Sequence, residues 1–343
     1  MATPPGCPTP NERSDVVIKI AYVVSPEPSL TATLMAQVGV THAVYCPSLK
    51  TIPNTPEDQQ PWSQAALGRA RDGFEKMGME VAVIESRPPM EKIKLGLPGR
   101  DEEVDVVCRF LRAMGAVGIP VWCSMWMPIL GVMRTSFAVP SRAGAKVSAF
   151  HLDQLPDQSL TPYGVIDEEQ QWENLRWFLE RTVPVAEKAG VKMAMHPDDP
   201  PHSPIRGVAR IISSIDNYQR MFDLVPSEAN GIGLCQGNFS LMTRDLPGVI
   251  HRFGRQGRIH FVHFRDVRGT SDSFVETFHD DGQTDLLECM RAYKDIGYEG
   301  VLRPDHYPKM GDDTYRDDLT LARFFAVGYI KGLREAVYGK QAG

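Results

Sequence analysis

The stretch Val-Lys-Met-Ala-Met-His-Pro-Asp-Asp-Pro-Pro, residues 191–201, decides how the rest of this chain is interpreted. Its apolar first half is typical of a buried β-strand. The strand must stop after His196, because the prolines that follow lack the backbone N–H that a sheet requires. A histidine and two carboxylates therefore stand at the end of a buried strand, where α/β proteins often place their functional groups.

Three later segments repeat this arrangement of a short apolar strand that ends in a polar group. Residues 231–235 end in a cysteine, residues 258–265 carry a histidine near their exit, and residues 300–306 end in Asp-His. Four successive predicted strands thus each present a side chain that can bind a metal ion, and these side chains are His196, Cys235, His263 and Asp305.

The alternation of strands and helices runs through the whole chain. The other strands are predicted at residues 16–24, 41–46, 79–84 and 121–126. The helices are predicted at residues 29–38, 62–77, 101–117, 168–189, 214–224, 243–254, 284–296 and 314–337. Eight strands that alternate with eight helices predict an α/β fold, the parallel (β/α)8 TIM barrel. All strands of such a barrel end at one mouth, so groups that are distant in sequence meet there.

The predicted domain organisation is simple. Residues 1–15 are rich in proline and polar residues and are expected to form a flexible tail. Residues 16–343 are expected to form a single TIM-barrel domain. A long connection at about residues 127–167 interrupts it, and a loop of that length is typical of a lid or of an arm that makes a homo-oligomer.

Composition excludes several classes of function. A net charge of −6 argues against nucleic acid or an anionic membrane as the partner. The chain has no long apolar run, and its first residues lack the apolar core of a signal peptide, so a cytoplasmic protein is expected. Six cysteines without framework spacing predict reduced thiols.

Each of the four strand-end donors has an ordinary structural explanation when it is taken alone. A histidine can be buried and hydrogen-bonded, a cysteine can act as a small apolar residue, and an aspartate can cap a helix. Four of them at equivalent positions on successive strands favour a metal site. Because sulfur is a soft ligand, the set suits Mn²⁺, Fe²⁺, Co²⁺ or Zn²⁺ and suits Mg²⁺ or Ca²⁺ poorly.

Cationic groups around the predicted mouth indicate an anionic substrate. Arg265 and Arg303 lie close in sequence to two of the donors, and a planar guanidinium matches a carboxylate. Together with a metal that acts as a Lewis acid, these arginines predict a small sugar acid as the substrate. The residues that we assign to substrate binding are Arg303, Arg210, Asp198, His279 and Glu276.

These segments together resemble the mannonate dehydratases, metal-dependent barrels akin to the xylose isomerase-like proteins. The likeness extends from about residue 81 to residue 333. The matching pieces are HPDDPP at 196–201, Gly207 with Arg210–Ile211, the 231–235 strand with Gly237, HFR at 263–265, RPDH at 303–306, Met127–Pro128 with Arg134–Thr135, Glu85–Ser86 with Ile93–Lys94, and Lys331–Gly332–Leu333.

The resemblance implies a metal-dependent lyase that dehydrates D-mannonate or a related aldonate to a 2-keto-3-deoxy acid, with Mn²⁺ as the usual ion. It implies His196, Cys235, His263 and Asp305 as the ligands, and His306 as an acid/base residue. In that reaction a proton next to a carboxylate is removed and the neighbouring hydroxyl is expelled. We assign Arg265 to stabilisation of the charge that develops.

The chain departs from the family pattern at several positions. The family carries a Trp-Tyr-Gly motif on the first strand and a histidine pair after the second, where this chain has Ile20–Ala21–Tyr22 and Tyr45–Cys46–Pro47. The histidine expected just before Glu276 is Val275. These departures predict a divergent member of the family, in which the metal site is retained and the substrate groups are altered.

A catalytic tyrosine expected shortly before the Lys-Gly-Leu motif aligns with Phe324. Tyr307, Tyr315 and Tyr329 are the tyrosines that could replace it. We assign this catalytic role to Tyr307, whereas Tyr329 lies on a predicted helix and suits packing.

Two other functions stay open at this point. The same type of barrel also supports sugar isomerases and epimerases, which would use two carboxylate bases beside the ion. A barrel that binds a metal without catalysis is the third reading, and a divergent member that acts on another polyhydroxy substrate is a variant of the first.

Overall fold

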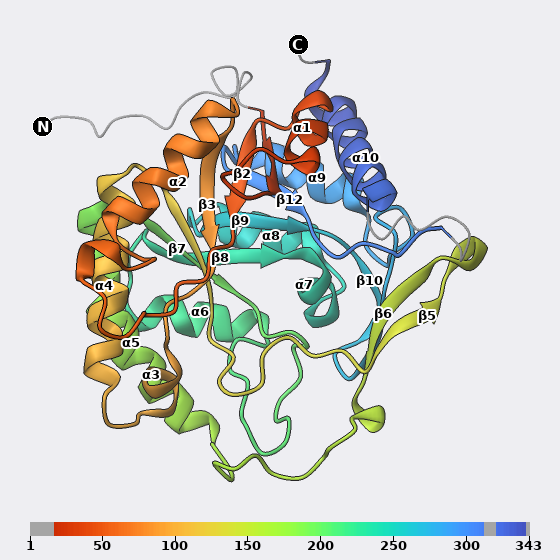
Figure 1. The fold of residues 1–343 in the computed structure, drawn as a ribbon. Helices are drawn as coiled ribbons and strands as arrows, with labels where there is room; N and C mark the ends of the chain where they lie inside the picture. The colour runs from red at the N-terminus through yellow and green to blue at the C-terminus, as the bar shows by residue number, and fades with distance from the viewer. Residues whose placement is uncertain (1–16, 312–319, 341–343) are drawn as a thin grey trace, which may run out of the picture.

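The computed structural model describes residues 17–311 and 320–340, and in this part of the chain eight parallel strands close into a barrel (Figure 1). In order around the barrel they are β1 (Lys19–Val23), β12 (Val301–Pro304), β9 (Ile259–Phe264), β8 (Asn230–Cys235), β7 (Lys192–His196), β4 (Val121–Met125), β3 (Glu80–Glu85) and β2 (His42–Tyr45). The predicted TIM barrel is therefore confirmed. The expected tail at residues 1–15 lies outside the described residues.

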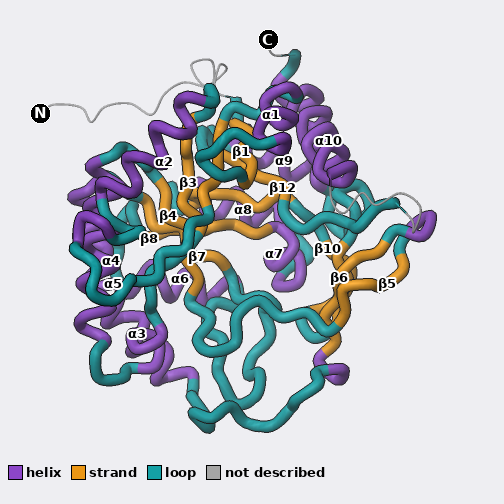
Figure 2. Tube along the Cα trace, in the orientation of Figure 1, coloured by secondary structure: helices purple, strands orange, loops and turns teal. Residues whose placement is uncertain are grey.

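Helices surround the barrel on its outer side (Figure 2). They are α1 (Leu30–Gln37), α2 (Gln64–Lys76), α3 (Glu91–Leu95), α4 (Arg100–Ala116), α5 (Glu168–Ala189), α6 (Ile215–Leu224), α7 (Gln236–Met242), α8 (Leu246–Gly254), α9 (Leu286–Asp295) and α10 (Thr320–Tyr338), with short 3₁₀ turns η1 (Glu57–Gln59), η2 (Arg142–Gly144) and η3 (Leu152–Gln154). Within the described ranges, no helix combines the length and the apolar character that crossing a bilayer requires.

Side-chain caps determine where several helices begin, which is why some predicted boundaries are shifted. Ser63, Asp245 and Asp285 each accept a hydrogen bond from a backbone N–H in the first turn of α2, α8 and α9. These helices therefore start two or three residues later than the apolar pattern predicts. The start of the last predicted helix, residues 314–319, lies outside the described residues.

The predicted long loop at 127–167 is partly wrong, because it contains two strands. β5 (Ser136–Pro140) and β6 (Lys146–His151) pair antiparallel, and β6 pairs with β11 (Ser273–Glu276), which pairs with β10 (Val267–Thr270). This four-stranded sheet stands beside the barrel mouth (Figure 1). The prediction missed it because a short strand becomes stable only through its partner, which here comes from more than a hundred residues away.

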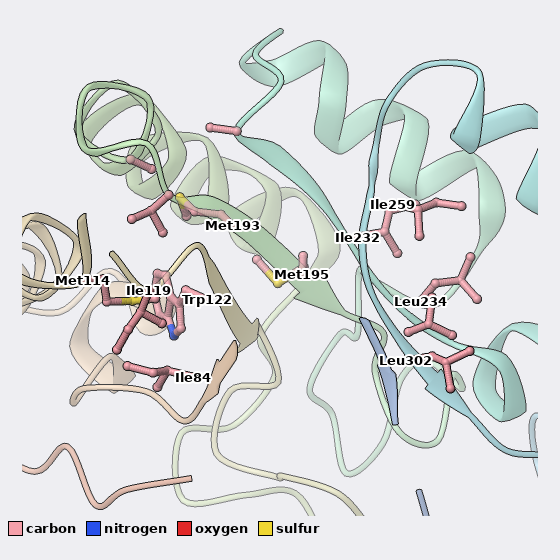
Figure 3. Packing of buried hydrophobic residues seen from close by; sticks show 14 of the residues in the cluster. Ile84, Met114, Ile119, Trp122, Met193, Met195, Ile232, Leu234, Ile259 and Leu302 are labelled. Carbon is pink, nitrogen blue, oxygen red and sulfur yellow. The ribbon is translucent and has the colours of Figure 1, made fainter. Parts of the chain in front are cut away.

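Side chains alternate along the barrel strands between the interior and the helical layer. Met193, Met195, Ile232, Leu234 and Leu302 are buried under the helices (Figure 3). The interior holds most of a second cluster of mainly small residues, which are Ala21, Val44, Ala82, Val83, Cys123, Ala194, Phe261 and Val301. Because the repeat along a strand is two residues, the next interior layer towards the mouth consists of the strand-end residues.

Candidate active site

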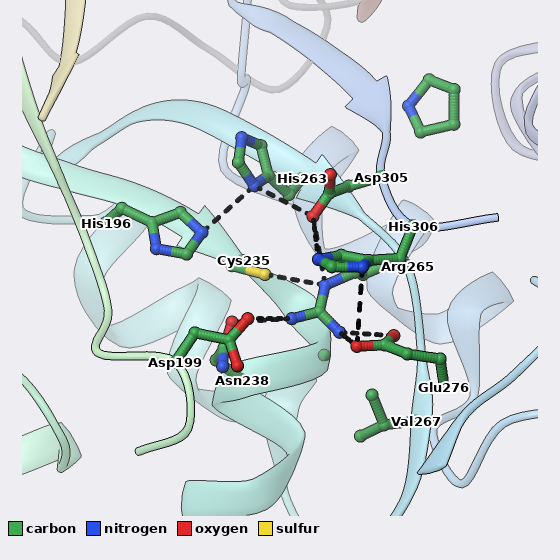
Figure 4. Close-up of polar contacts among 12 residues, drawn as sticks. His196, Asp199, Cys235, Asn238, His263, Arg265, Val267, Glu276, Asp305 and His306 are labelled. Carbon is green, nitrogen blue, oxygen red and sulfur yellow. Dashed lines mark hydrogen bonds and ion pairs between the residues drawn. The ribbon is translucent and has the colours of Figure 1, made fainter. Parts of the chain in front are cut away.

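The interior layer at the barrel mouth is made of charged and metal-binding side chains. His196 stands two residues beyond Ala194, His263 two beyond Phe261, Arg303 two beyond Val301, and Glu85 two beyond Val83, while Cys235 ends β8. Donor atoms of His196, Cys235 and His263 all lie within 4.8 Å of one another, and the three side chains are buried (Figure 4). The fold thus brings together three of the four predicted ligands.

Both histidines turn one ring nitrogen towards this cluster. His196 Nδ1 lies 2.7 Å from the Pro197 carbonyl oxygen, and that contact requires a proton on Nδ1 and leaves Nε2 with its lone pair. His196 Nε2 lies 3.2 Å from His263 Nδ1, so two nitrogens face the same point. On its other side, His263 Nε2 lies 3.3 Å from a carboxylate oxygen of Glu85.

Asp305, the fourth predicted ligand, follows β12 directly. Its Oδ2 atom lies 3.5 Å from His263 Nδ1 and 3.3 Å from Arg265 Nε. Although burial opposes ionisation, Arg303 and the neighbouring cationic groups hold the pKa of Asp305 well below its usual range. Asp305 is therefore a charged oxygen donor beside the three-residue cluster.

The electrostatic environment suits a cation. Burial lowers the pKa of His196, which keeps this imidazole neutral and able to act as a ligand. Burial opposes protonation of His263 as well, but the carboxylates of Glu85 and Asp305 outweigh that effect and raise its pKa. A buried site in which carboxylates attract positive charge, with nitrogen, sulfur and oxygen donors, fits a divalent transition ion.

All the N–H donors of Arg265 form hydrogen bonds with protein groups. Its Nε donates to Cys235 Sγ at 3.2 Å, and Nη1 donates to both Glu276 oxygens at 2.9 and 2.7 Å. Nη2 donates to Asp199 Oδ2 at 3.2 Å and to Asn238 Oδ1 at 2.8 Å. A guanidinium has five N–H donors, so none remains for a substrate. In this geometry Arg265 orients the Cys235 side chain.

Glycine at position 237 makes room for this guanidinium. A Cβ added to Gly237 would lie 2.5 Å from Arg265 Nη1 and 2.8 Å from its central carbon. Arg265 cannot simply move away, because its five bonds hold it in place. Position 237 therefore requires glycine, because any side chain there would clash with Arg265.

Arg303 is also engaged with the protein. Nε and Nη2 form a two-fold pair with Glu85 at 2.8 and 2.7 Å, while Nη1 donates to Asp305 Oδ1 at 2.8 Å and to the Pro304 carbonyl at 3.0 Å. This geometry holds Glu85 against His263 and Asp305 beside the cluster. Substrate binding by Arg303 stays a prediction, and the structure shows its guanidinium hydrogen-bonded to Glu85, Asp305 and the Pro304 carbonyl.

A buried ion-pair network surrounds Arg265. It was not predicted from the sequence. Arg134, with a side chain only 2% exposed, donates to both oxygens of Asp199 at 2.7 and 3.0 Å and to Glu276 at 2.5 Å. Arg134 and Arg265 hold the pKa of Asp199 far below its usual range against the effect of burial. Glu276, predicted to bind substrate, is instead shared by the two arginines. The sequence feature that pointed to Arg134 was the Arg134–Thr135 pair, which matches the family pattern.

His306 lies at the rim of the cluster and is partly exposed. Its side chain is 30% exposed, with Nε2 3.5 Å from Asp305 Oδ2 and Nδ1 3.8 Å from Glu276 Oε1. Its backbone adopts φ +47°, a left-handed conformation that is strained for a residue other than glycine and turns the ring towards the mouth. Burial lowers the pKa of His306, so the neutral imidazole is favoured.

Two of the three predicted tyrosines, Tyr307 and Tyr329, lie within the described residues, and both make contacts with other protein groups. The Tyr307 hydroxyl donates to the Pro304 carbonyl at 3.0 Å, and its ring stacks with His279 at 6.2 Å. Phe324 packs against the main core, and Tyr329 stacks on Phe325. Tyr315 lies outside the described residues.

Three more predicted substrate-binding residues are buried behind the mouth. Asp198 accepts a hydrogen bond from the Ile212 backbone N–H at 2.8 Å, and Arg210 donates to the carbonyls of Leu130 and Gly131. Burial lowers the pKa of His279 to about 4. Asp198 and Arg210 brace the loops after β4 and β7.

A cleft of about 680 Å³ opens at the ends of β2, β3 and β4. Glu85 and Cys123 line its inner end, and donor atoms of these two residues lie within 4.8 Å of a His263 nitrogen. The cleft therefore leads from solvent towards His263, one of the predicted metal ligands, and its volume suits a small sugar derivative. Of the segments at residues 48–51 and 86–91 that form its walls, only Ser86 belongs to a motif that the sequence had indicated.

Fold and site together define a TIM barrel with a candidate metal centre at its mouth. The crystal structure of D-psicose 3-epimerase from Clostridium cellulolyticum H10 shares this fold, with a TM-score of 0.60 at 14% identity over 94% of this chain and 100% of that one. At that identity the likeness shows the fold alone.

Sequence relatives define the family within this class. The D-mannonate dehydratase (UxuA) family model matches residues 20–162 and 151–342. Mannonate dehydratase from Thermotoga maritima is 35% identical over 314 residues, covering 80% of this chain and 86% of the relative. The crystal structure of mannonate dehydratase from Streptococcus suis serotype 2 has a TM-score of 0.82 at 30% identity, covering 95% and 98%. The chain belongs to the D-mannonate dehydratase family, which confirms the predicted family and the predicted class of hydro-lyases.

Proposed function

We propose that this protein dehydrates D-mannonate or a related aldonate to a 2-keto-3-deoxy acid. The observation that carries the proposal is the convergence of His196, Cys235, His263 and Asp305 at the mouth, with His306 beside Asp305. Membership of the family and the curated mannonate dehydratases that resemble the chain support the same reaction.

These four donors would hold the metal ion, and Mn²⁺ is the ion that we propose. The orientation of both histidine rings and the mixed nitrogen, sulfur and oxygen donor set fit a divalent transition ion. When bound, such an ion supplies Lewis acidity to a substrate oxygen. Glu85 and Arg265 orient His263 and Cys235 from behind.

His306 is the group that we assign to proton transfer. Its neutral imidazole takes the proton from the carbon next to the carboxylate, and the imidazolium then returns this proton to the departing hydroxyl, which leaves as water. The enol that remains rearranges to the 2-keto acid. Tyr307 takes no part in this step, because its hydroxyl already donates to the Pro304 carbonyl.

An epimerase would need a second free carboxylate base, and the described site offers none. Glu85 is paired with Arg303, and Asp199 and Glu276 are paired with both Arg134 and Arg265. The dehydratase proposal therefore accounts better for the charged groups that surround the donors.

The test is turnover by the Mn²⁺-loaded protein with D-mannonate and its epimeric aldonates, monitored by formation of a 2-keto-3-deoxy acid. Product from at least one aldonate is expected. An epimerised aldonate or no product from the whole set, with metal bound, would contradict the proposal.

Homo-oligomer formation through the segment at 127–167 stays a prediction, as does the cytoplasmic location. Several apolar side chains of this segment are solvent-exposed, and they are Val132, Phe137, Leu160, Tyr163 and Val165.

A further inference from the structure

The cleft that leads to His263 contains two cations that pair with no carboxylate of the described residues. Arg87 is half-buried on the loop after β3, and Lys50 is exposed on the loop after β2. Within the described part of the chain, the Arg87 guanidinium makes one hydrogen bond, from Nη1 to Met125 Sδ at 3.4 Å. A thioether is a weak acceptor, so most of the donors of Arg87 remain available.

The carboxylates that line the same cleft are already neutralised. Glu85 is held by Arg303 at 2.7 Å and lies against His263. Glu91 accepts from Lys94 Nζ at 2.8 Å and from the Ile129 backbone N–H at 2.8 Å. Arg87 and Lys50 therefore leave a positive potential in the cleft, which favours an anion.

Arg87 lies close to the donor cluster. Met125, which it contacts, ends β4 and is the register partner of His196 on β7. The guanidinium thus reaches the strand that neighbours a predicted metal ligand, whereas Arg265 and Arg303 are committed to Glu276, Asp199 and Glu85. A carboxylate that enters this cleft meets Arg87 as its first free guanidinium.

We propose that Arg87, assisted by Lys50, binds the carboxylate of the substrate and thereby selects an aldonate over a neutral polyol. The inference rests on the proposed function, since it places the hydroxyl-bearing carbons towards the donor cluster and His306. A planar guanidinium can donate two parallel hydrogen bonds to a carboxylate, and a lysine cannot reproduce that geometry.

The experiment compares binding of D-mannonate and D-mannitol to the Mn²⁺-loaded protein by calorimetry, together with steady-state kinetics. D-mannitol has the same length and differs by a CH₂OH group in place of the carboxylate. The variants are Arg87→Gln, Arg87→Lys and, as a control, Arg255→Gln, an exposed arginine after α8. Arg323→Gln tests the cation on α10 that lies 6.0 Å from the Tyr307 ring centre.

We expect Arg87→Gln to weaken D-mannonate binding about 10- to 100-fold and to raise KM more than it lowers kcat, while D-mannitol binding stays within about two-fold. Arg87→Lys should fall between Arg87→Gln and the wild type, and Arg255→Gln should match the wild type. D-mannonate binding that survives Arg87→Gln, or that is lost with Arg323→Gln instead, would overturn the inference.

The two proposals fail in different ways. Turnover that continues with an unchanged KM in Arg87→Gln contradicts the inference and leaves the dehydratase function standing. D-mannonate binding that depends on Arg87 without any turnover supports the inference and contradicts the dehydratase function. A wild-type protein that binds no aldonate contradicts both.

Discussion

At the scale of single residues, each side chain of the candidate metal cluster is oriented by a contact with a second protein group. The Pro197 carbonyl orients His196, Glu85 faces His263, and Arg265 donates to Cys235. Outer contacts of this kind fix ring tautomers and tune the basicity of ligands. The arginines next to the predicted ligands, Arg265 and Arg303, direct their hydrogen bonds to the protein groups that surround the donors.

We predict that Cys235→Ser and His196→Ala lose bound metal, because each removes a donor from the buried cluster. Metal content after dialysis against a weak chelator, measured by plasma mass spectrometry, is the test. Cys108→Ser is the matched control, since Cys108 lies on α4, where its Sγ contacts the Arg181 carbonyl. Full metal stoichiometry in either site variant would remove that residue from the ligand set.

His306→Asn should retain the metal and lose activity. The metal should remain because the imidazole lies beside the cluster and is not one of the four predicted ligands. Activity should fall because general acid–base catalysis typically contributes about 10²- to 10⁴-fold to a rate. We expect kcat to fall by that factor with unchanged metal content. A variant that keeps more than a tenth of the wild-type kcat would show that another group transfers the proton.

At the scale of elements, the segment between β4 and β6 is tied to the barrel by buried charge. Arg134 precedes β5 and pairs with Asp199 beyond β7 and with Glu276 at the end of β11. Three segments that are far apart in sequence thus meet at one guanidinium. This arrangement holds the four-stranded sheet beside the barrel mouth.

Arg134→Gln should destabilise the protein by about 3–5 kcal/mol, because breaking a buried ion pair leaves a charge without its partner. The matched control is Arg142→Gln, whose pair with Asp280 is exposed and should contribute about 1 kcal/mol or less. Urea unfolding of both variants measures the difference. Equal losses in the two variants would show that the Arg134 network does not stabilise the fold.

Much of the barrel and of the donor set could be predicted from the sequence because the signals are local. A buried strand such as 191–196 shows its apolar pattern and its terminal histidine within a few residues. The pairing of β6 with β11 could not be predicted, since its partners are distant in sequence. For the same reason, the sequence could not show which hydrogen-bond donors of Arg87 and Arg265 have partners. In the folded chain, Arg87 makes one hydrogen bond to the described residues, and all five donors of Arg265 are engaged.

At the scale of the whole molecule, the end of the barrel opposite the mouth contributes a pH dependence of stability. Burial and the nearby Lys192 lower the pKa of His260 on β9 to about 3. In the unfolded chain the same group has a pKa of about 6.5. Below about pH 6.5 the unfolded state therefore binds a proton at this histidine and the folded state does not. The free energy of unfolding decreases as the pH falls through this range.

Between pH 7 and pH 5, we expect this single group to cost the folded state about 2 kcal/mol. His260→Gln should unfold in urea with a smaller loss of free energy over that interval than the wild type. An identical pH dependence in the two proteins would mean that His260 is protonated in the folded state.

The proposed activity depends most on a metal ion at the barrel mouth, held by side chains at or just beyond the ends of four strands. Anomalous diffraction at the manganese absorption edge, from crystals of the Mn²⁺-loaded protein, locates that ion directly. We predict one strong peak in contact with His196 Nε2, Cys235 Sγ, His263 Nδ1 and Asp305. A loaded crystal with no peak there, or with its peak between Glu85 and Cys123, would contradict the proposed metal site.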